Sequence, residues 1–161
     1  MRFLTYHSLS EFLNSGYVTI DCRYQISLSL IESIKLLHSL EIFHGDISPH
    51  NIIVSRQYPI LIDFEASNNE NKSSFYNPPE YFDTVNWKNC KASDLWLLGI
   101  ILFSMWSDEP LPTGCWYIGV EESLSSFRDP NDLIFHNSIP PLIYHTIMRL
   151  LDHNPLTRMI I

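Results

Sequence analysis

Two aspartates and one asparagine are the residues of this sequence whose types and spacing indicate chemistry. Asn51 lies five residues after Asp46, a spacing that alone indicates only a turn, because Asp and Asn are common in turns. Asp63 changes this interpretation, because the segments 51–54 and 59–62 are predicted to pair as a β-hairpin that brings all three side chains to one mouth. Transfer of a phosphoryl group from a nucleotide requires such a set. Asp46 would orient the attacking hydroxyl as a base, and Asn51 and Asp63 would bind Mg²⁺.

Long helices are expected on both sides of this hairpin in the chain. Apolar residues recur at helical spacing from about Tyr24 to Ser39, which predicts a long helix with a wide apolar face. A second helix, capped by Ser93 or Asp94 and ending near Ser107, is apolar on all sides and must therefore be buried. The other predicted elements are a short helix over 11–14, a last helix from 140–141 to about 151, and loops over 66–79 and 109–138.

The composition fits one domain with a core of its own. The chain has 161 residues, of which 45% are hydrophobic and 13% aromatic, and this content excludes a wholly disordered chain. Lys and Arg number 10 against 18 Asp and Glu, which gives a net charge of -8. Such a charge argues against broad contact with phosphate backbones, so nucleic acid is not expected as a partner.

The cysteines and the apolar segments indicate the compartment. Cys22, Cys90 and Cys115 are too few and too scattered for a disulfide framework or a zinc site, so we expect free thiols in a reducing compartment. The longest apolar stretch, Leu95 to Trp106, is shorter than a membrane span, and the first residues lack the apolar run of a secretory signal. We expect a soluble intracellular protein, cytoplasmic or nuclear, with no membrane partner.

The order of several motifs identifies a resemblance. Residues 44–51 read H-G-D-I-S-P-H-N, and residues 63–65 read D-F-E. These segments resemble the H-R-D-L-K-P-x-N catalytic loop and the D-F-G motif of the eukaryotic protein kinase superfamily. Further segments are similar, in the same order, to the motifs Y-x-A-P-E, D-x-W-x-x-G and L-L-x-x-x-P-x-x-R, and these are residues 76–80, 94–99 and 150–158.

The resemblance covers essentially the whole chain and implies a fold. It implies a mainly α protein, the C-terminal lobe of a protein kinase, which is a helical bundle with a small catalytic-loop β-hairpin. Residues 1–161 would form one kinase-like domain that consists of the hinge and this lobe, with the small lobe absent. Leu37-His38 resembles the L-H that ends the helix before the catalytic loop, although a polar residue at a helix end explains His38 equally well.

The resemblance also assigns roles at the proposed site. Asp46 would be the catalytic base, and Asn51 and Asp63 would hold the metal and the nucleotide phosphates. Ile53 would lie beneath the adenine ring. ATP and Mg²⁺ are the cofactors of an active enzyme, whereas an inactive homologue needs neither.

Other residues are assigned structural roles by the same resemblance. His44 would pack in the core against Phe64 rather than move protons. Asp94 would hold the backbone of the His44 loop, and Glu80 would form a salt bridge with Arg158.

Three positions depart from the family pattern and weaken the case for activity. Gly45 replaces the arginine that in many kinases receives an activation-loop phosphate. Ser48 replaces the lysine that steadies the transferred phosphate, so charge stabilisation of the transition state is lost. Glu65 replaces the glycine of D-F-G, as in small-molecule kinases such as choline kinase, so metal binding remains possible.

These observations favour an inactive or very weak serine/threonine kinase homologue that acts by binding a protein. Without a small lobe the chain has no Gly-rich loop, no ATP-anchoring lysine and no partner glutamate. The expected partner is a kinase, a kinase substrate or a separate small lobe. One alternative is an active phosphotransferase completed by a missing or separate small lobe, and a further alternative is a fragment of a small-molecule kinase.

Overall fold

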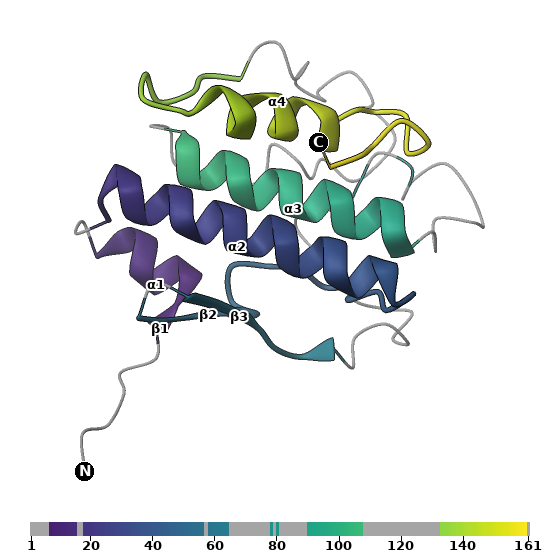
Figure 1. The fold of residues 1–161 in the computed structure, drawn as a ribbon, viewed down its shortest axis with the longest axis horizontal. Helices are drawn as coiled ribbons and strands as arrows, with labels where there is room; N and C mark the ends of the chain where they lie inside the picture. The colour runs from purple at the N-terminus through teal and green to yellow at the C-terminus, as the bar shows by residue number, and fades with distance from the viewer. Residues whose placement is uncertain are drawn as a thin grey trace, which may run out of the picture.

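Three stacked helices form the body of the described structure. The computed structural model describes residues 7–15, 18–56, 58–64, 78, 80, 90–107 and 133–160. Helix α3 lies between α2 and α4, and a small sheet together with α1 lies on the other side of α2 (Figure 1). The elements are β1 (His7–Ser8), α1 (Leu9–Asn14), α2 (Ile20–Ser39), β2 (Ile52–Ser55), β3 (Tyr58–Leu61), α3 (Cys90–Trp106) and α4 (Pro141–Leu150).

Helix α1 begins earlier than the predicted range of 11–14 because a capping box defines its start. The Ser8 hydroxyl accepts a hydrogen bond from the Glu11 N–H at 3.2 Å, and the Ser8 N–H donates to the Glu11 carboxylate at 3.0 Å. Two backbone donors at the helix end are satisfied in this way. The helix therefore begins at Leu9, whose side chain is fully buried.

Helix α2 also begins before its predicted start and ends at Ser39, as predicted. The Thr19 side chain accepts a hydrogen bond from the Cys22 N–H at 3.2 Å, which caps the helix at Ile20 rather than near Tyr24. Cys22 is a free, buried cysteine, and burial raises the pKa of its thiol. The side chains of Cys90 and Cys115 lie outside the described residues.

The predicted N-cap of helix α3 is wrong. It begins at Cys90, so neither Ser93 nor Asp94 caps it, and Asp94 lies inside the helix with its side chain completely buried. The expected burial of this helix is observed, since Trp96 and Trp106 have no exposed surface.

Helices α3 and α4 come closest at Gly99. A Cβ atom placed there would lie 2.8 Å from Leu151 Cδ2 and 2.9 Å from Leu150 Cβ. Real Cβ atoms do not approach other atoms so closely, so only glycine lets the C-terminal end of α4 lie against α3. Helix α4 itself begins at Pro141, in the first helical position that favours proline.

The three strands form an antiparallel sheet of order β1-β2-β3. Ile52 pairs with Leu61 and Ile53 with Ile60, so the predicted hairpin is present, with each of its four strand ends shifted by one residue. The sequence did not predict β1, which pairs two residues with β2. Neighbouring residues of a strand point to opposite faces, and Ile52 is fully buried while Ile60 on the other face is 45% exposed.

The predicted loops over 66–79 and 109–138 lie mostly outside the described residues, as does Glu65. Within the described part of the chain, no helix combines the length and the apolar character that crossing a bilayer demands.

Candidate active site

A buried carboxylate on α3 holds the start of the loop 44–51. The His44 N–H donates to Asp94 Oδ2 at 2.9 Å, and the Gly45 N–H donates to Asp94 Oδ1 at 2.8 Å. Gly45 has a φ of 78°, in the left-handed region that glycine adopts without steric cost. The two bonds fix the peptide units that lead directly into Asp46.

Asp46 and Asn51 are joined inside this loop. The Asn51 side-chain nitrogen donates to the Asp46 carbonyl oxygen at 2.9 Å and to the Asp46 carboxylate at 3.0 Å. The Asn51 N–H also donates to the Ser48 carbonyl at 3.0 Å, which closes a tight turn between the two side chains. Because its nitrogen faces Asp46, the Asn51 amide oxygen points to the other side, where it can serve as a ligand.

Asp63 lies at the end of the hairpin, next to a residue that pairs with Asn51. The Ile62 N–H donates to the Asn51 carbonyl at 3.0 Å, and Asp63 follows Ile62 in the chain. Asp63 is exposed, and its φ of 65° is unusual for a residue other than glycine. Such conformations cost energy and concentrate at functional sites, where they direct a side chain.

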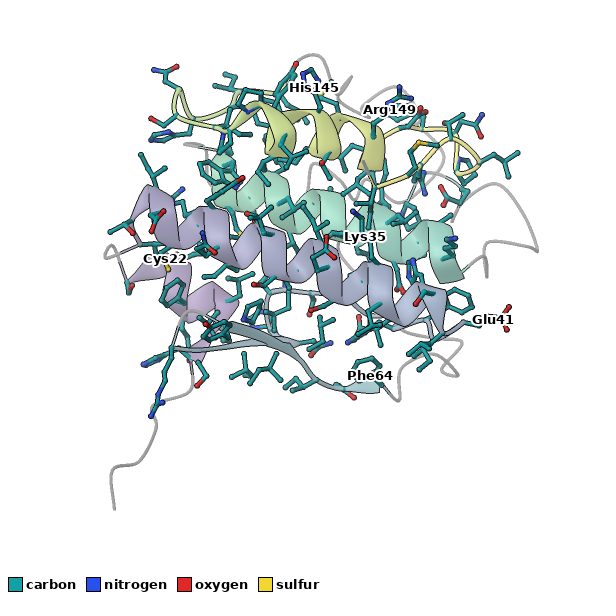
Figure 2. All side chains as sticks on the ribbon, viewed as in Figure 1. Cys22, Lys35, Glu41, Phe64, His145 and Arg149 are labelled. Carbon is teal, nitrogen blue, oxygen red and sulfur yellow. The ribbon has the colours of Figure 1, made fainter. Side chains whose placement is uncertain are left out.

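His44 and Phe64 connect the loop with the end of the hairpin. The His44 ring nitrogen Nε2 lies 3.0 Å from the Ile62 carbonyl, and its ring centroid lies 4.6 Å from that of Phe64. His44 has no exposed surface, and Phe64 lies beyond the end of β3 at the edge of the molecule (Figure 2). These contacts are those of a packed residue, as expected for His44.

Ile53 lies on the outer face of the sheet. It is partly buried, and its neighbour across the strands is the exposed Ile60. Tyr58 and Ile62 lie on this same face by the alternation of the strand, and both are exposed. The four side chains Ile53, Tyr58, Ile60 and Ile62, named here the outer sheet face, form an apolar surface next to Asn51.

The Glu80 and Arg158 side chains form a bidentate ion pair. Arg158 Nη1 and Nη2 donate to the two Glu80 carboxylate oxygens at 2.5 and 2.7 Å. The guanidinium also donates to the Ala92 and Asp152 carbonyls and lies 4.8 Å from the centre of the Trp96 ring. Arg158 thereby links the start of α3 with the segment after α4.

The sequence left the role of one residue at this site open. His38 Nε2 lies 3.0 Å from Asp94 Oδ2, and the His38 side chain is only 5% exposed. The Leu37-His38 dipeptide was the available signal, but it did not show that the ring faces inward. The Asp94 carboxylate therefore has three polar neighbours, which are the His44 N–H, the Gly45 N–H and the His38 ring.

The described carboxylate, imidazole and thiol side chains include no group of three that could hold a metal ion. A divalent cation at the mouth would instead use the Asn51 amide oxygen and the Asp63 carboxylate, and these hard oxygen donors suit Mg²⁺.

Comparison with known proteins supports the interpretation of these motifs. Residues 1–160 match the protein kinase domain. The chain is 27% identical to the serine/threonine-protein kinase/endoribonuclease IRE1 of Oryza sativa subsp. japonica, over 92% of the chain and 19% of that protein. It is 26% identical to a probable cAMP-dependent protein kinase catalytic subunit of Encephalitozoon cuniculi, over 81% of the chain and 41% of that protein.

Mitogen-activated protein kinase 2 of Pneumocystis carinii is 32% identical over 58% of the chain and 30% of that protein. The chain thus spans less than half the length of these three relatives. Its motifs, its loop held by Asp94 and its match over almost every residue agree, and the chain belongs to the protein kinase domain family.

Proposed function

We propose that this chain is the C-terminal lobe of a serine/threonine kinase homologue that acts by binding a protein and transfers phosphate weakly or not at all by itself. The carrying observation is the hydrogen-bonded pair of Asp46 and Asn51, with Asp63 one residue beyond the backbone pairing of Ile62 with Asn51. This arrangement supports recognition of a phosphate and a cation, whereas neighbouring positions lack charges that transfer would use.

The chemistry of the mouth follows from its donors. The Asp46 carboxylate would accept the proton of an acceptor hydroxyl and orient that hydroxyl toward the phosphate. The Asn51 amide holds this carboxylate in place through its nitrogen. The Asn51 oxygen and the Asp63 carboxylate would bind Mg²⁺, which supplies positive charge against the phosphate oxygens.

Weak transfer is proposed because positive charge is lacking at two positions of the loop. Ser48 stands where the kinase motif has lysine, and a hydroxyl cannot offset the negative charge that develops on the transferred phosphate. Gly45 likewise offers no guanidinium to an activation-loop phosphate. Typical electrostatic contributions of this kind amount to about 3 kcal/mol, or roughly two orders of magnitude in rate.

The proposed partner surface is the outer sheet face. Ile60 is 45% exposed, and Tyr58 and Ile62 are also exposed beside it. Contiguous exposed apolar side chains commonly mark a protein interface. A protein that covers this surface would also cover Ile53, on which an adenine ring would rest.

Phosphate transfer by the purified 161-residue chain tests the proposal. With Mg·ATP and a basic protein as acceptor, we expect incorporation no greater than that of Asp46→Ala, and binding of Mg·ATP that is weak and reduced by Asp63→Ala. Glu32→Ala serves as a control, because Glu32 is an exposed residue of α2 that contacts only Lys35 among the ion pairs of the described residues. Transfer that depends on Mg·ATP and is abolished by Asp46→Ala would overturn the proposal.

A second candidate is an active phosphotransferase completed by a small lobe, either on a separate chain or encoded upstream of Met1. The left-handed conformation of Asp63 favours it, because a costly backbone conformation is retained beside the metal ligands. The coding DNA upstream of Met1 is the direct check. An in-frame Gly-rich loop and a V-A-x-K strand would support this candidate, and stop codons without a split exon would count against it.

A further inference from the structure

The two edges of the sheet differ in what satisfies their backbone groups. The strand order is β1-β2-β3, so β1 and β3 are the edge strands. At the β1 edge, the Ser8 N–H donates to the Glu11 carboxylate at 3.0 Å. At the β3 edge, the Leu61 N–H has no hydrogen-bond partner among the described residues. An edge strand with unpaired backbone groups is a template for a further strand.

The pairing with β2 determines which groups of β3 face this edge. The Ile62 N–H donates to the Asn51 carbonyl at 3.0 Å, which makes these two residues a hydrogen-bonded pair. Hydrogen-bonded and non-hydrogen-bonded pairs alternate along antiparallel strands, so the N–H and C=O groups of Leu61 face away from β2. Pro59 has the same orientation but offers only its carbonyl. The open edge therefore presents one backbone donor and two acceptors.

The same strand presents apolar side chains on the outer sheet face. Tyr58 is 70% exposed, Ile60 45% and Ile62 40%. The Leu61 side chain, on the opposite face, packs against the core and holds the strand in place. A strand added at this edge would place every second side chain next to the three exposed ones. Asp63 adds an exposed carboxylate just beyond them, which is complementary to a positive charge on the added strand.

We propose that β3 accepts an extended strand of a protein partner, which is apolar at alternate positions and carries a basic residue beside Asp63. Antiparallel pairing is the more stable arrangement per residue. In it, the partner residue opposite Leu61 exchanges two hydrogen bonds with Leu61, and the residue two positions later donates to the Pro59 carbonyl. Pro59 has no N–H, so it limits the pairing to these three bonds.

The net charge favours such a partner over a second copy of the chain. Each copy carries a net charge of -8, so two copies repel each other, whereas a basic strand is attracted. The inference rests on the proposed function for the choice of the outer sheet face as the partner surface. It adds the backbone groups that bind the partner and the chemistry of the segment that they select.

Peptides with modified backbones test the pairing on the unchanged chain. The probe is acetyl-Lys-Val-Thr-Val-Thr-Val-amide, whose lysine would lie beside Asp63 and whose first threonine would lie opposite Leu61. A methyl group on the nitrogen of the first threonine removes the bond to the Leu61 carbonyl. A methyl group on the nitrogen of the second valine, which would face away from β3, is the matched control. Titration of the ¹⁵N-labelled chain, followed at the Ile60 and Ile62 amides, measures binding.

The unmodified and the valine-methylated peptides should bind alike at millimolar concentration. The threonine-methylated peptide should bind about tenfold more weakly, because one hydrogen bond of typical strength is lost. Leu61→Pro removes the edge donor and should weaken binding by about the same factor, and Leu61→Ala keeps that donor and controls for the lost side chain. If Leu61→Pro does not fold, the two methylated peptides decide, since they are measured on the unchanged chain.

The other outcomes separate the two proposals. Equal binding of the two methylated peptides, or no change at Ile60 and Ile62 with any peptide, would overturn the inference. Dimers in sedimentation that Leu61→Pro abolishes would overturn it as well, because a second copy would then occupy the edge. Binding that is lost in Ile60→Lys but tolerates both methyl groups would show docking on the outer sheet face alone, which leaves the proposed function intact. Phosphate transfer abolished by Asp46→Ala, with the expected peptide pattern, would contradict the proposed function alone.

Discussion

At the scale of single residues, Gly45 shows how one substitution in a motif can alter charge and preserve backbone geometry. The kinase motif has arginine at this position, and this chain has glycine with a φ of 78°. The positive charge is lost, yet the peptide still donates to Asp94. The loop therefore keeps the backbone hydrogen bond to Asp94 but lacks the arginine side chain that would bind a phosphate.

Gly45→Ala should lower the free energy of unfolding by about 1–2 kcal/mol, the cost of a left-handed conformation for a residue with a Cβ atom. Gly45→Asn should cost clearly less, since asparagine tolerates this conformation. Urea denaturation monitored by tryptophan fluorescence measures both. Equal losses would mean that the space around residue 45, rather than its backbone conformation, determines the effect.

Asp152 is a residue whose ionisation should affect stability. The Asn154 N–H donates to its Oδ1 at 3.0 Å, and this backbone bond, helped by Thr157 and by the charge of Arg158, lowers the pKa of the carboxyl group. A lowered pKa in the folded state means that the contribution is fully present above the unfolded value, about 3.9, and is lost as the pH falls through the folded value.

Asp152→Asn should therefore reduce stability at pH 6, and this loss should shrink as the pH falls through the lowered pKa of the carboxyl group. Urea midpoints of both proteins across this pH range measure the difference. The Asn side chain still offers an oxygen to the Asn154 N–H, so the comparison isolates the charge. A difference that stays constant with pH would contradict the assignment.

The sequence predicted contacts where the partners are close in the chain, and it did so poorly where a distant partner determines the orientation of a side chain. Asp46 and Asn51 are five residues apart, and their side chains are joined by a hydrogen bond. The orientation of His38 depends on Asp94, which is 56 residues away on another helix. No pattern near His38 reports that partner.

At the scale of the elements, α3 shows why helix boundaries were harder to predict than helices. Asp favours helix caps and disfavours helix interiors, so the sequence placed Asp94 at the start of α3. In the structure α3 begins at Cys90, because hydrogen bonds from His38, His44 and Gly45 outweigh the local preference of Asp94. Rules of local propensity fail at this position because the residue serves a distant loop.

Gly99→Ala tests the close contact between α3 and α4. In a solvent-exposed helix this change would raise the free energy of unfolding by about 1 kcal/mol. Here the new Cβ atom would lie less than 3 Å from atoms of Leu151 and Leu150. We expect a net loss of about 1–3 kcal/mol as the helices separate. Denaturation of Gly99→Ala, Leu151→Ala and the double variant measures the coupling.

The double variant should lose less than the sum of the two single variants, because removal of the Leu151 side chain makes room for the new Cβ atom. Simple additivity would indicate that the contact at Gly99 does not limit the packing of α4.

At the scale of the whole molecule, the Glu80 and Arg158 pair joins segments that are 78 residues apart. Arg158 is almost fully buried. Removal of Glu80 therefore leaves its positive charge without the carboxylate that it now binds. Glu80→Ala should lower the free energy of unfolding by about 3 kcal/mol.

The exposed pair of Glu32 and Lys35 on α2 is the matched comparison. Glu32→Ala should change stability by less than about 0.5 kcal/mol, because exposed ion pairs are screened by water and salt. Thermal denaturation of both variants provides the measurement. A similar small effect of the two substitutions would show that Glu80 does not stabilise the assembled fold.

The dependence of the catalytic loop on Asp94 also determines when the loop can form during synthesis. The Gly45 peptide leaves the ribosome before Asp94, which follows 49 residues later, so this hydrogen bond cannot form until the start of α3 has been made. Asp46 and Asn51 are thus present in the growing chain before their surroundings are. A product that stopped anywhere before α3 would carry every residue of the loop in the correct order, but it would lack the carboxylate that holds the first two peptides of the loop.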